Sequence, residues 1–314
     1  MKTLLVIAAL ALALCGCKKT SGGALVDPAL ATLVPADTTM LVGIRVEDLL
    51  KTPIYKKYLA DRALAPLDDF SEQFGIDPRK DIWELLFIFN GKESVILGRG
   101  KFPSEPEQRF PSELQGATRT NYRGYNLIGN DQTSLVLIGA TVAGVGDTAG
   151  LKRILDARAQ TNGPPAVLAP RMQEVPVTAG FWSVYAGSPI SVPAGASANM
   201  GNMVKILNSI QSGAFYMDLR TAVSGKATGM AATDAAAKEL HDSLRGLLGL
   251  GRLMGAKDDV KMQRLFDGLR ITLDGKNVNL YIEEQEDAIP TLMDFLPMGQ
   301  GRGKAPASGL RSLK

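Results

Sequence analysis

The chain contains very few of the side chains that carry most enzyme chemistry. Its 314 residues include only two cysteines, Cys15 and Cys17, and a single histidine, His241. Two cysteines this close to the N-terminus form neither a CxxC redox centre nor a cysteine zinc site. One histidine cannot provide the two ligands of an HExxH metalloprotease or of a bis-histidine haem. These absences exclude thiol redox chemistry and histidine-rich metal centres.

His241 is also a poor member of a catalytic triad. It lies beside Asp242 and Ser243 in a stretch with helical character, and adjacent residues on a helix point in different directions. We therefore expect a partly exposed helical histidine. The sequence has no GxSxG or SxxK motif either, so no catalytic, cofactor-binding or metal-binding residue is predicted.

Neither sign of charge dominates the chain. There are 35 basic and 32 acidic residues, and the formal net charge is +3. This field is too weak to indicate nucleic-acid binding. Hydrophobic residues make up 45% and charged residues 21%, which is typical of a folded globular protein.

What the chain does have is a distinctive start, MKTLLVIAALALALCGCKK. Lys2 is followed by eleven apolar residues, 4–14, a run too short to cross a bilayer core that needs about twenty. Residues 1–16 are therefore interpreted as a secretory signal peptide. Its end resembles the lipobox of bacterial lipoproteins, with Leu14 at −3, Gly16 at −1 and Cys17 at +1. An alternative, in which both cysteines are ordinary residues of a signal cleaved elsewhere, stays open.

The lipobox resemblance implies a location. It predicts diacylation of the Cys17 thiol, cleavage before this residue and acylation of the new amino group, and several acyl chains anchor a protein stably in a bilayer. We expect an exported protein held to the bacterial cell envelope by Cys17. Lys18 is not the aspartate that retains lipoproteins at the inner membrane of enteric bacteria, so the outer membrane is preferred. Residues 17–32 are predicted to be a flexible tether, and residues 298–314 a disordered basic tail.

The body between these ends is interpreted as two α+β halves, residues 33–163 and 164–297. Alternating apolar residues and Asn-Gly or Asp-Gly turns predict antiparallel hairpins. We expect two tandem antiparallel sheets with helices packed on one face of each. Strands are predicted near residues 40–46, 85–89, 94–97, 122–147, within 175–187, and near 214–219, 222–230 and 269–284. Helices are predicted near residues 53–74, 105–114, 148–159, 200–210, 233–254, 258–268 and 289–296.

Four motifs have alternative interpretations. Residues 144–150 have the spacing GxGxxxG before a helix, but a turn with Asp147 as helix N-cap is simpler than a phosphate cradle. Residues 224–228 resemble a P-loop only in part and suit a strand better. The acidic run 283–287 lacks calcium-loop spacing and suits a solvated strand end. Glycines in the helix 233–254 permit an apolar groove, although ordinary core packing is favoured; the groove residues are Leu247, Leu248, Leu250, Leu253 and Met254.

One resemblance extends beyond the signal peptide. Within residues 34–102, the segments VPADTTMLVGIRVEDLLKTP, FGIDPRKDIWEL and VILGRGKF are similar to uncharacterised bacterial predicted lipoproteins that carry domains of unknown function. The resemblance implies a fold and a location, and it carries no catalytic residue to this chain.

Three functions follow as hypotheses. The first is a non-enzymatic envelope lipoprotein that acts by contact with a partner protein, and the alternative is a carrier of a hydrophobic ligand such as lipid. An enzyme is the third. A broad exposed apolar patch favours the partner protein, a large apolar cavity favours the carrier, and converging carboxylates in a cleft favour the enzyme.

Overall fold

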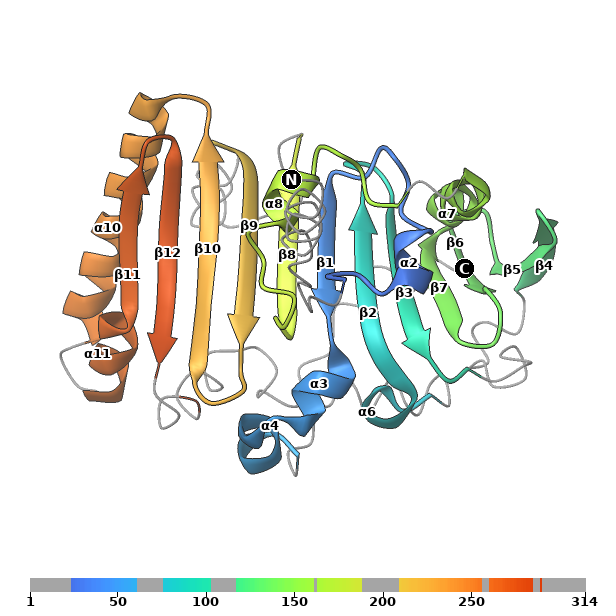
Figure 1. Ribbon diagram of the computed structural model, residues 1–314, viewed down its shortest axis with the longest axis horizontal. Coiled ribbons are helices and arrows are strands. Elements are labelled where there is room, and N and C mark those ends of the chain that lie inside the picture. Colours follow the sequence, from blue (N-terminus) through green and yellow to red (C-terminus); the bar gives the residue numbers. More distant parts are fainter. Residues whose placement is uncertain are drawn as a thin grey trace, which may run out of the picture.

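Twelve strands lie side by side in one antiparallel sheet (Figure 1). The computed structural model describes residues 24–60, 76–102, 117–160, 163–187, 209–255, 260–284 and residue 289, and the strand count refers to these. The sheet order is β11-β12-β10-β9-β8-β1-β2-β3-β7-β6-β5-β4. The strands are β1 Met40–Ile44, β2 Ile82–Phe89, β3 Ser94–Gly100, β4 Thr118–Tyr122, β5 Tyr125–Gly129, β6 Thr133–Leu137, β7 Val142–Asp147, β8 Phe181–Ala186, β9 Ile210–Asp218, β10 Val223–Ala231, β11 Leu269–Asp274 and β12 Asn277–Glu284.

The two predicted halves share this sheet, so the prediction of two tandem sheets is wrong. β1 opens the first half and β8 opens the second, and they pair from Met40↔Tyr185 to Ile44↔Phe181. This pairing gives each strand a partner for backbone groups that a separate sheet would leave exposed at its edge. The α+β class and the antiparallel strands are confirmed.

The hairpins occur where the sequence predicts them. Asn90 and Gly91 connect β2 to β3, and the Asn90 side-chain oxygen accepts hydrogen bonds from the backbone of Lys92 and Glu93 at 3.0 and 2.8 Å. Gly275 turns the chain between β11 and β12 with a φ of 53°, a left-handed conformation that glycine adopts without steric cost.

Helices cover opposite faces of the sheet at its two ends. They are α2 Pro28–Ala31, α3 Val46–Lys51, α4 Pro53–Tyr58, α6 Pro78–Asp81, α7 Thr148–Gln160, α8 Ala169–Met172, α10 Asp234–Gly255 and α11 Val260–Asp267. α7 buries Leu151 and Ile154 in the main core, on the face of Leu41. α10 packs on Val278, and the strand register places Val278 on the face of Met40, opposite Leu41. The sequence predicts helices on one face of each of two sheets; in the single sheet observed, α7 and α10 lie on opposite faces.

The tether predicted for residues 17–32 is wrong from residue 24 onward. Leu25, Val26 and Leu30 are 8%, 3% and 0% exposed and belong to the main core. The Asp27 carboxylate accepts a hydrogen bond from the Ala29 amide and caps α2. Burial of these three apolar side chains favours a folded segment. It prevails over the Gly and Pro residues, which suggested a flexible linker. We call residues 24–34 the N-terminal strap.

Other predictions have mixed outcomes. α7, α10 and α11 match the helices predicted at residues 148–159, 233–254 and 258–268. Ile210 begins β9 instead of ending a helix. The signal peptide, Cys17, residues 61–75, the helix at 105–114, residues 200–208, most of 289–296 and the tail 298–314 lie outside the described residues. None of the helices in the described ranges is long and apolar enough to span a membrane.

Candidate functional site

Three short helices project from one end of the sheet (Figure 1). β1 and β9 end there, and β2, β8 and β10 begin there. We call this end, with α3, α4, α6 and the β9–β10 turn, the helical pole. The Thr52 hydroxyl separates α3 from α4, because it donates to the Leu49 carbonyl at 2.7 Å and accepts from the Tyr55 amide at 3.1 Å. Pro53 fits the first turn of α4, where its missing N–H costs nothing.

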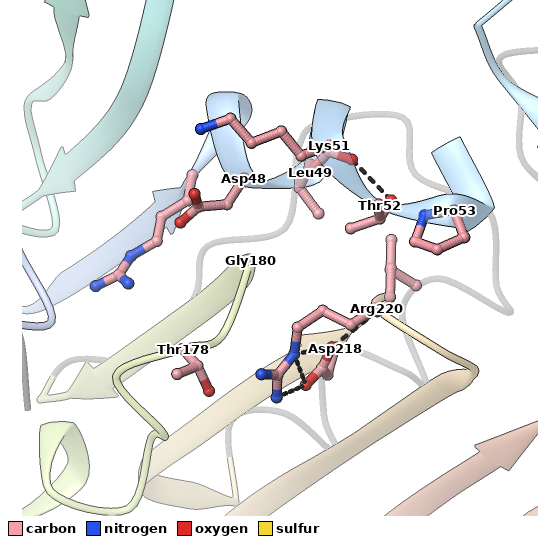
Figure 2. Close-up of a pocket in the computed structure, with 11 residues that line it drawn as sticks. Asp48, Leu49, Lys51, Thr52, Pro53, Thr178, Gly180, Asp218 and Arg220 are labelled. Carbon is pink, nitrogen blue, oxygen red and sulfur yellow. Dashed lines mark hydrogen bonds and ion pairs between the residues drawn. The ribbon is translucent and has the colours of Figure 1, made fainter. Parts of the chain in front are cut away.

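A groove of about 350 Å³ lies between α3–α4 and the β9–β10 turn. Asp48 and Lys51 lie on one side of it and Asp218 and Arg220 on the other (Figure 2). The lining residues are Arg45, Asp48, Leu49, Lys51, Thr52, Pro53, Thr178, Gly180, Asp218, Leu219 and Arg220. Charged, polar and apolar groups therefore alternate around an open depression.

Ion pairs set the charge state of this groove. The Arg220 Nε donates to the two Asp218 carboxylate oxygens at 3.0 and 2.8 Å. These hydrogen bonds hold the pKa of Asp218 below its ordinary value. On the other side, Lys51 pairs with Glu47 at 2.7 Å. Asp218 is thus ionised at neutral pH, and a carboxylate with a lowered pKa is a weak general base.

Close packing shapes the floor of the groove. The Arg45 amide donates to the Gly180 carbonyl at 2.8 Å, which ties the end of β1 to the start of β8. A Cβ atom on Gly180 would lie 2.6 Å from Leu49 Cδ2. The glycine therefore allows α3 to approach β8, and this approach creates the groove.

The N-terminal strap enters the body at the same pole. The Arg45 Nη2 donates to the Ala24 and Leu25 carbonyls at 2.9 and 3.3 Å. The Asp27 amide donates to the Glu84 carboxylate at 3.3 Å, and burial raises the pKa of that carboxyl group. Both contacts hold the first described residues beside the end of β1 and the start of β2.

A second feature is an exposed apolar face on α10. Leu247, Leu250 and Leu253 are 55%, 57% and 70% exposed, and we call these three residues the α10 ridge. The other side of the helix packs on the sheet through Ala237 and Leu240. Ordinary core packing, the interpretation favoured from the sequence, is therefore wrong for these three leucines. Leu248 is half-buried, and the side chain of Met254 lies outside the described residues.

The helix glycines have different roles. A Cβ atom on Gly251 would lie 2.6 Å from the Phe266 ring, so this glycine permits the close contact between α10 and α11. Gly246 and Gly249 face open space. Close approach by another element is thus confirmed at one of these three positions.

The remaining sequence motifs form no site among the described residues. Asp147 accepts hydrogen bonds from the Ser94 amide and hydroxyl at 2.6 and 3.2 Å, so it ties β7 to β3. A Cβ on Gly146 would lie 2.4 Å from the Ser94 carbonyl oxygen, which explains that glycine by strand packing. Residues 224–228 lie within β10, and Glu283 and Glu284 end β12. The described ranges contain no cluster of three potential metal ligands.

His241 lies on α10, as the sequence predicts. Its Nδ1 is 3.0 Å from the Asp242 carboxylate, and Ser243 is exposed. His241 is half-buried, which confirms the expected partly exposed helical histidine, and it contacts its neighbour Asp242 although adjacent helix residues were expected to point apart.

None of the groove residues stands out in the sequence. They come from residues 45–53, 178–180 and 218–220, which meet only because β1 pairs with β8 and β8 with β9. The Thr52-Pro53 cap is the one local signal that marks part of the site.

Comparisons with known proteins support the fold. No protein-family profile and no characterised protein matches the sequence. The chain is similar in structure to TP0453. Crystal form III of TP0453 has a TM-score of 0.51 and 11% identity, covering 85% of this chain and 98% of that chain. Crystal form I has a TM-score of 0.48 and 13% identity over 85% and 96%. At this identity the likeness concerns the fold alone.

Proposed function

We propose that this protein is a bacterial envelope lipoprotein, anchored through acylated Cys17, that binds a partner protein through the α10 ridge. The exposure of Leu247, Leu250 and Leu253 is the observation that carries the partner-binding part. The anchor at Cys17 is inferred from the lipobox resemblance, and Lys18 favours the outer membrane. The similarity to TP0453 concerns the fold only.

The spacing of the ridge suits helix docking. A single exposed leucine on a protein surface is ordinary. The three leucines lie at i, i+3 and i+6, about one helical turn apart. A helix that docks in a partner's groove presents apolar anchors at similar intervals, i, i+3, i+4 and i+7. Arg245 is exposed beside the ridge, so the partner surface would combine an apolar groove with an acidic residue at its rim.

A second candidate function is the binding of a small ligand in the groove at the helical pole. Its volume of about 350 Å³ lies near the lower end of the range for ligand sites. Charged residues on both sides suit a small amphipathic molecule better than a long acyl chain. The carrier hypothesis is therefore retained in this narrower form.

Site-specific crosslinking in intact cells tests the partner-binding proposal. A photoreactive residue at position 250 should give a discrete protein adduct, which Leu247→Glu on the same chain should abolish. Val167 is the control position, because it is also 57% exposed but lies outside the ridge. Adducts with lipid alone at position 250, or equal protein adducts from both positions, would refute docking through the ridge.

A further inference from the structure

We infer that the helical pole faces the bilayer that holds the anchor, and that cations of this pole contact anionic lipid headgroups. This inference rests on the acylation of Cys17 in the proposed function. It adds an orientation of the body and a contact surface, neither of which depends on the α10 ridge.

The position of the N-terminal strap is the first observation. Arg45 follows the last residue of β1 and holds the Ala24 and Leu25 carbonyls. Glu84, near the start of β2, holds the Asp27 amide. The strap then continues into the core through Leu30 and Leu33, which are fully buried. The chain between the anchor and the body therefore leaves from the helical pole.

The short length of that connecting chain is the second observation. Six residues lie between Cys17 and Ala24, and the seven Cα–Cα steps from one to the other span at most about 25 Å when extended. β9 and β10 have nine residues each, and strands of this length measure roughly 30 Å. The anchor cannot reach past the opposite end of the sheet while the strap stays folded. The helical pole is therefore the end of the body that stays nearest the bilayer.

The chemistry of α4 is the third observation. Its sequence is PIYKKY, with Lys56 and Lys57 exposed and no acidic residue. The Lys57 Nζ lies 5.1 Å from the centre of the Tyr58 ring. Lysines are attracted to anionic headgroups, and tyrosines are enriched at the boundary between lipid and water. This combination suits an anionic bilayer surface.

Several described acidic residues of the pole pair with cations close to them in the sequence: Glu47 with Lys51, Asp77 with Lys80 and Asp218 with Arg220. Asp48 lies on α3, beside the groove. α4 is the cationic element that follows it and projects from the sheet (Figure 1). The contact with headgroups is therefore assigned to α4.

Fluorescence energy transfer in vesicles tests the orientation. The full-length acylated protein is reconstituted into vesicles containing phosphatidylglycerol and an acceptor-labelled lipid headgroup. A donor is attached at Ala60→Cys, next to α4, or at Lys92→Cys, at the far end of β2; both positions are exposed. Processing and acylation leave no native thiol to compete for the label. The inference predicts stronger transfer from position 60 than from position 92.

Charge reversal tests the headgroup contact. Lys56→Glu with Lys57→Glu should reduce the transfer from position 60, and so should neutral phosphatidylcholine vesicles or high salt. The matched control is Lys276→Glu in the β11–β12 turn, which should leave the transfer unchanged. Transfer from position 60 that is insensitive to all three changes would overturn the headgroup contact.

Two other outcomes separate the inference from the proposal on which it rests. Equal transfer from positions 60 and 92, with the protein bound to vesicles, would overturn the orientation and leave the anchor intact. Protein that stays in the aqueous phase would overturn the Cys17 anchor, and the orientation with it.

Discussion

At the scale of single residues, the contact between Gly43 and Trp182 holds the two halves of the sequence together. The residues are paired across β1 and β8, and Trp182 is fully buried. A Cβ atom on Gly43 would lie 2.2 Å from the indole ring. The ring therefore occupies the space that any side chain at position 43 would need.

We predict that Gly43→Ala destabilises the protein by about 1–3 kcal/mol, the usual cost of overpacking a core. Chemical denaturation measures this free energy of unfolding. Gly246→Ala is the matched control, because Gly246 faces open space on α10, and it should gain about 1 kcal/mol from helix propensity. A Gly43→Ala protein as stable as the parent would show that β1 and β8 do not pack in this way.

Glu84 gives a prediction about pH. Burial raises the pKa of its carboxyl group in the folded protein, so the folded state binds the proton more tightly than the unfolded state. The contribution of Glu84 to stability is therefore complete at low pH and is lost as the pH rises through the raised pKa. The Glu84→Gln variant, which carries no charge, should match the parent near pH 4 and gain relative to it by about pH 8. A stability difference that stays constant with pH would contradict this assignment.

At the scale of elements, the N-terminal strap is an integral part of the core. Leu30 is fully buried there, so Leu30→Ala should cost about 2–5 kcal/mol in unfolding free energy. Leu250→Ala, on the exposed α10 ridge, should change stability by less than about 0.5 kcal/mol. Thermal or chemical denaturation of both variants measures the difference. Equal, small effects would mean that residues 24–34 behave as a tether after all.

Local signals predicted the elements of this fold well. The dipeptides Asn90-Gly91 and Asp274-Gly275 each favour a turn through their own two residues. The sequence alone therefore locates both hairpins. The periodicity of α7 and α10 is likewise a property of one segment. The pairing of β1 with β8 joins residues more than a hundred positions apart, and no local pattern specifies it. For this reason the elements could be predicted and their assembly into one sheet could not.

In the candidate sites too, local features could be predicted from the sequence and long-range packing could not. The leucines of the α10 ridge stand out in the sequence, but whether they face the core or solvent depends on how α10 docks on Val278 and Ala231. The groove was not predicted because its residues come from three distant segments. Gly22, Gly23 and Pro28 predict a flexible linker, but the buried side chains of Leu25 and Leu30 fold the strap onto the core.

At the scale of the whole molecule, one wide sheet carries its helices on opposite faces at its two ends (Figure 1). The start of the N-terminal strap, the groove and the cationic α4 all lie at the helical pole. The α10 ridge lies on the flank formed by α10, α11, β11 and β12. The proposed account therefore separates a surface for the bilayer from a surface for a protein partner.

The anchor is the central claim, and the mature N-terminus tests it most directly. Mass spectrometry of the protein extracted from its native membrane with detergent should find a chain that begins at Cys17 and carries acyl chains on that residue. Cys17→Ala should accumulate as an uncleaved, unacylated precursor. A native chain that begins at any other residue, or a Cys17 without acyl chains, would contradict the account.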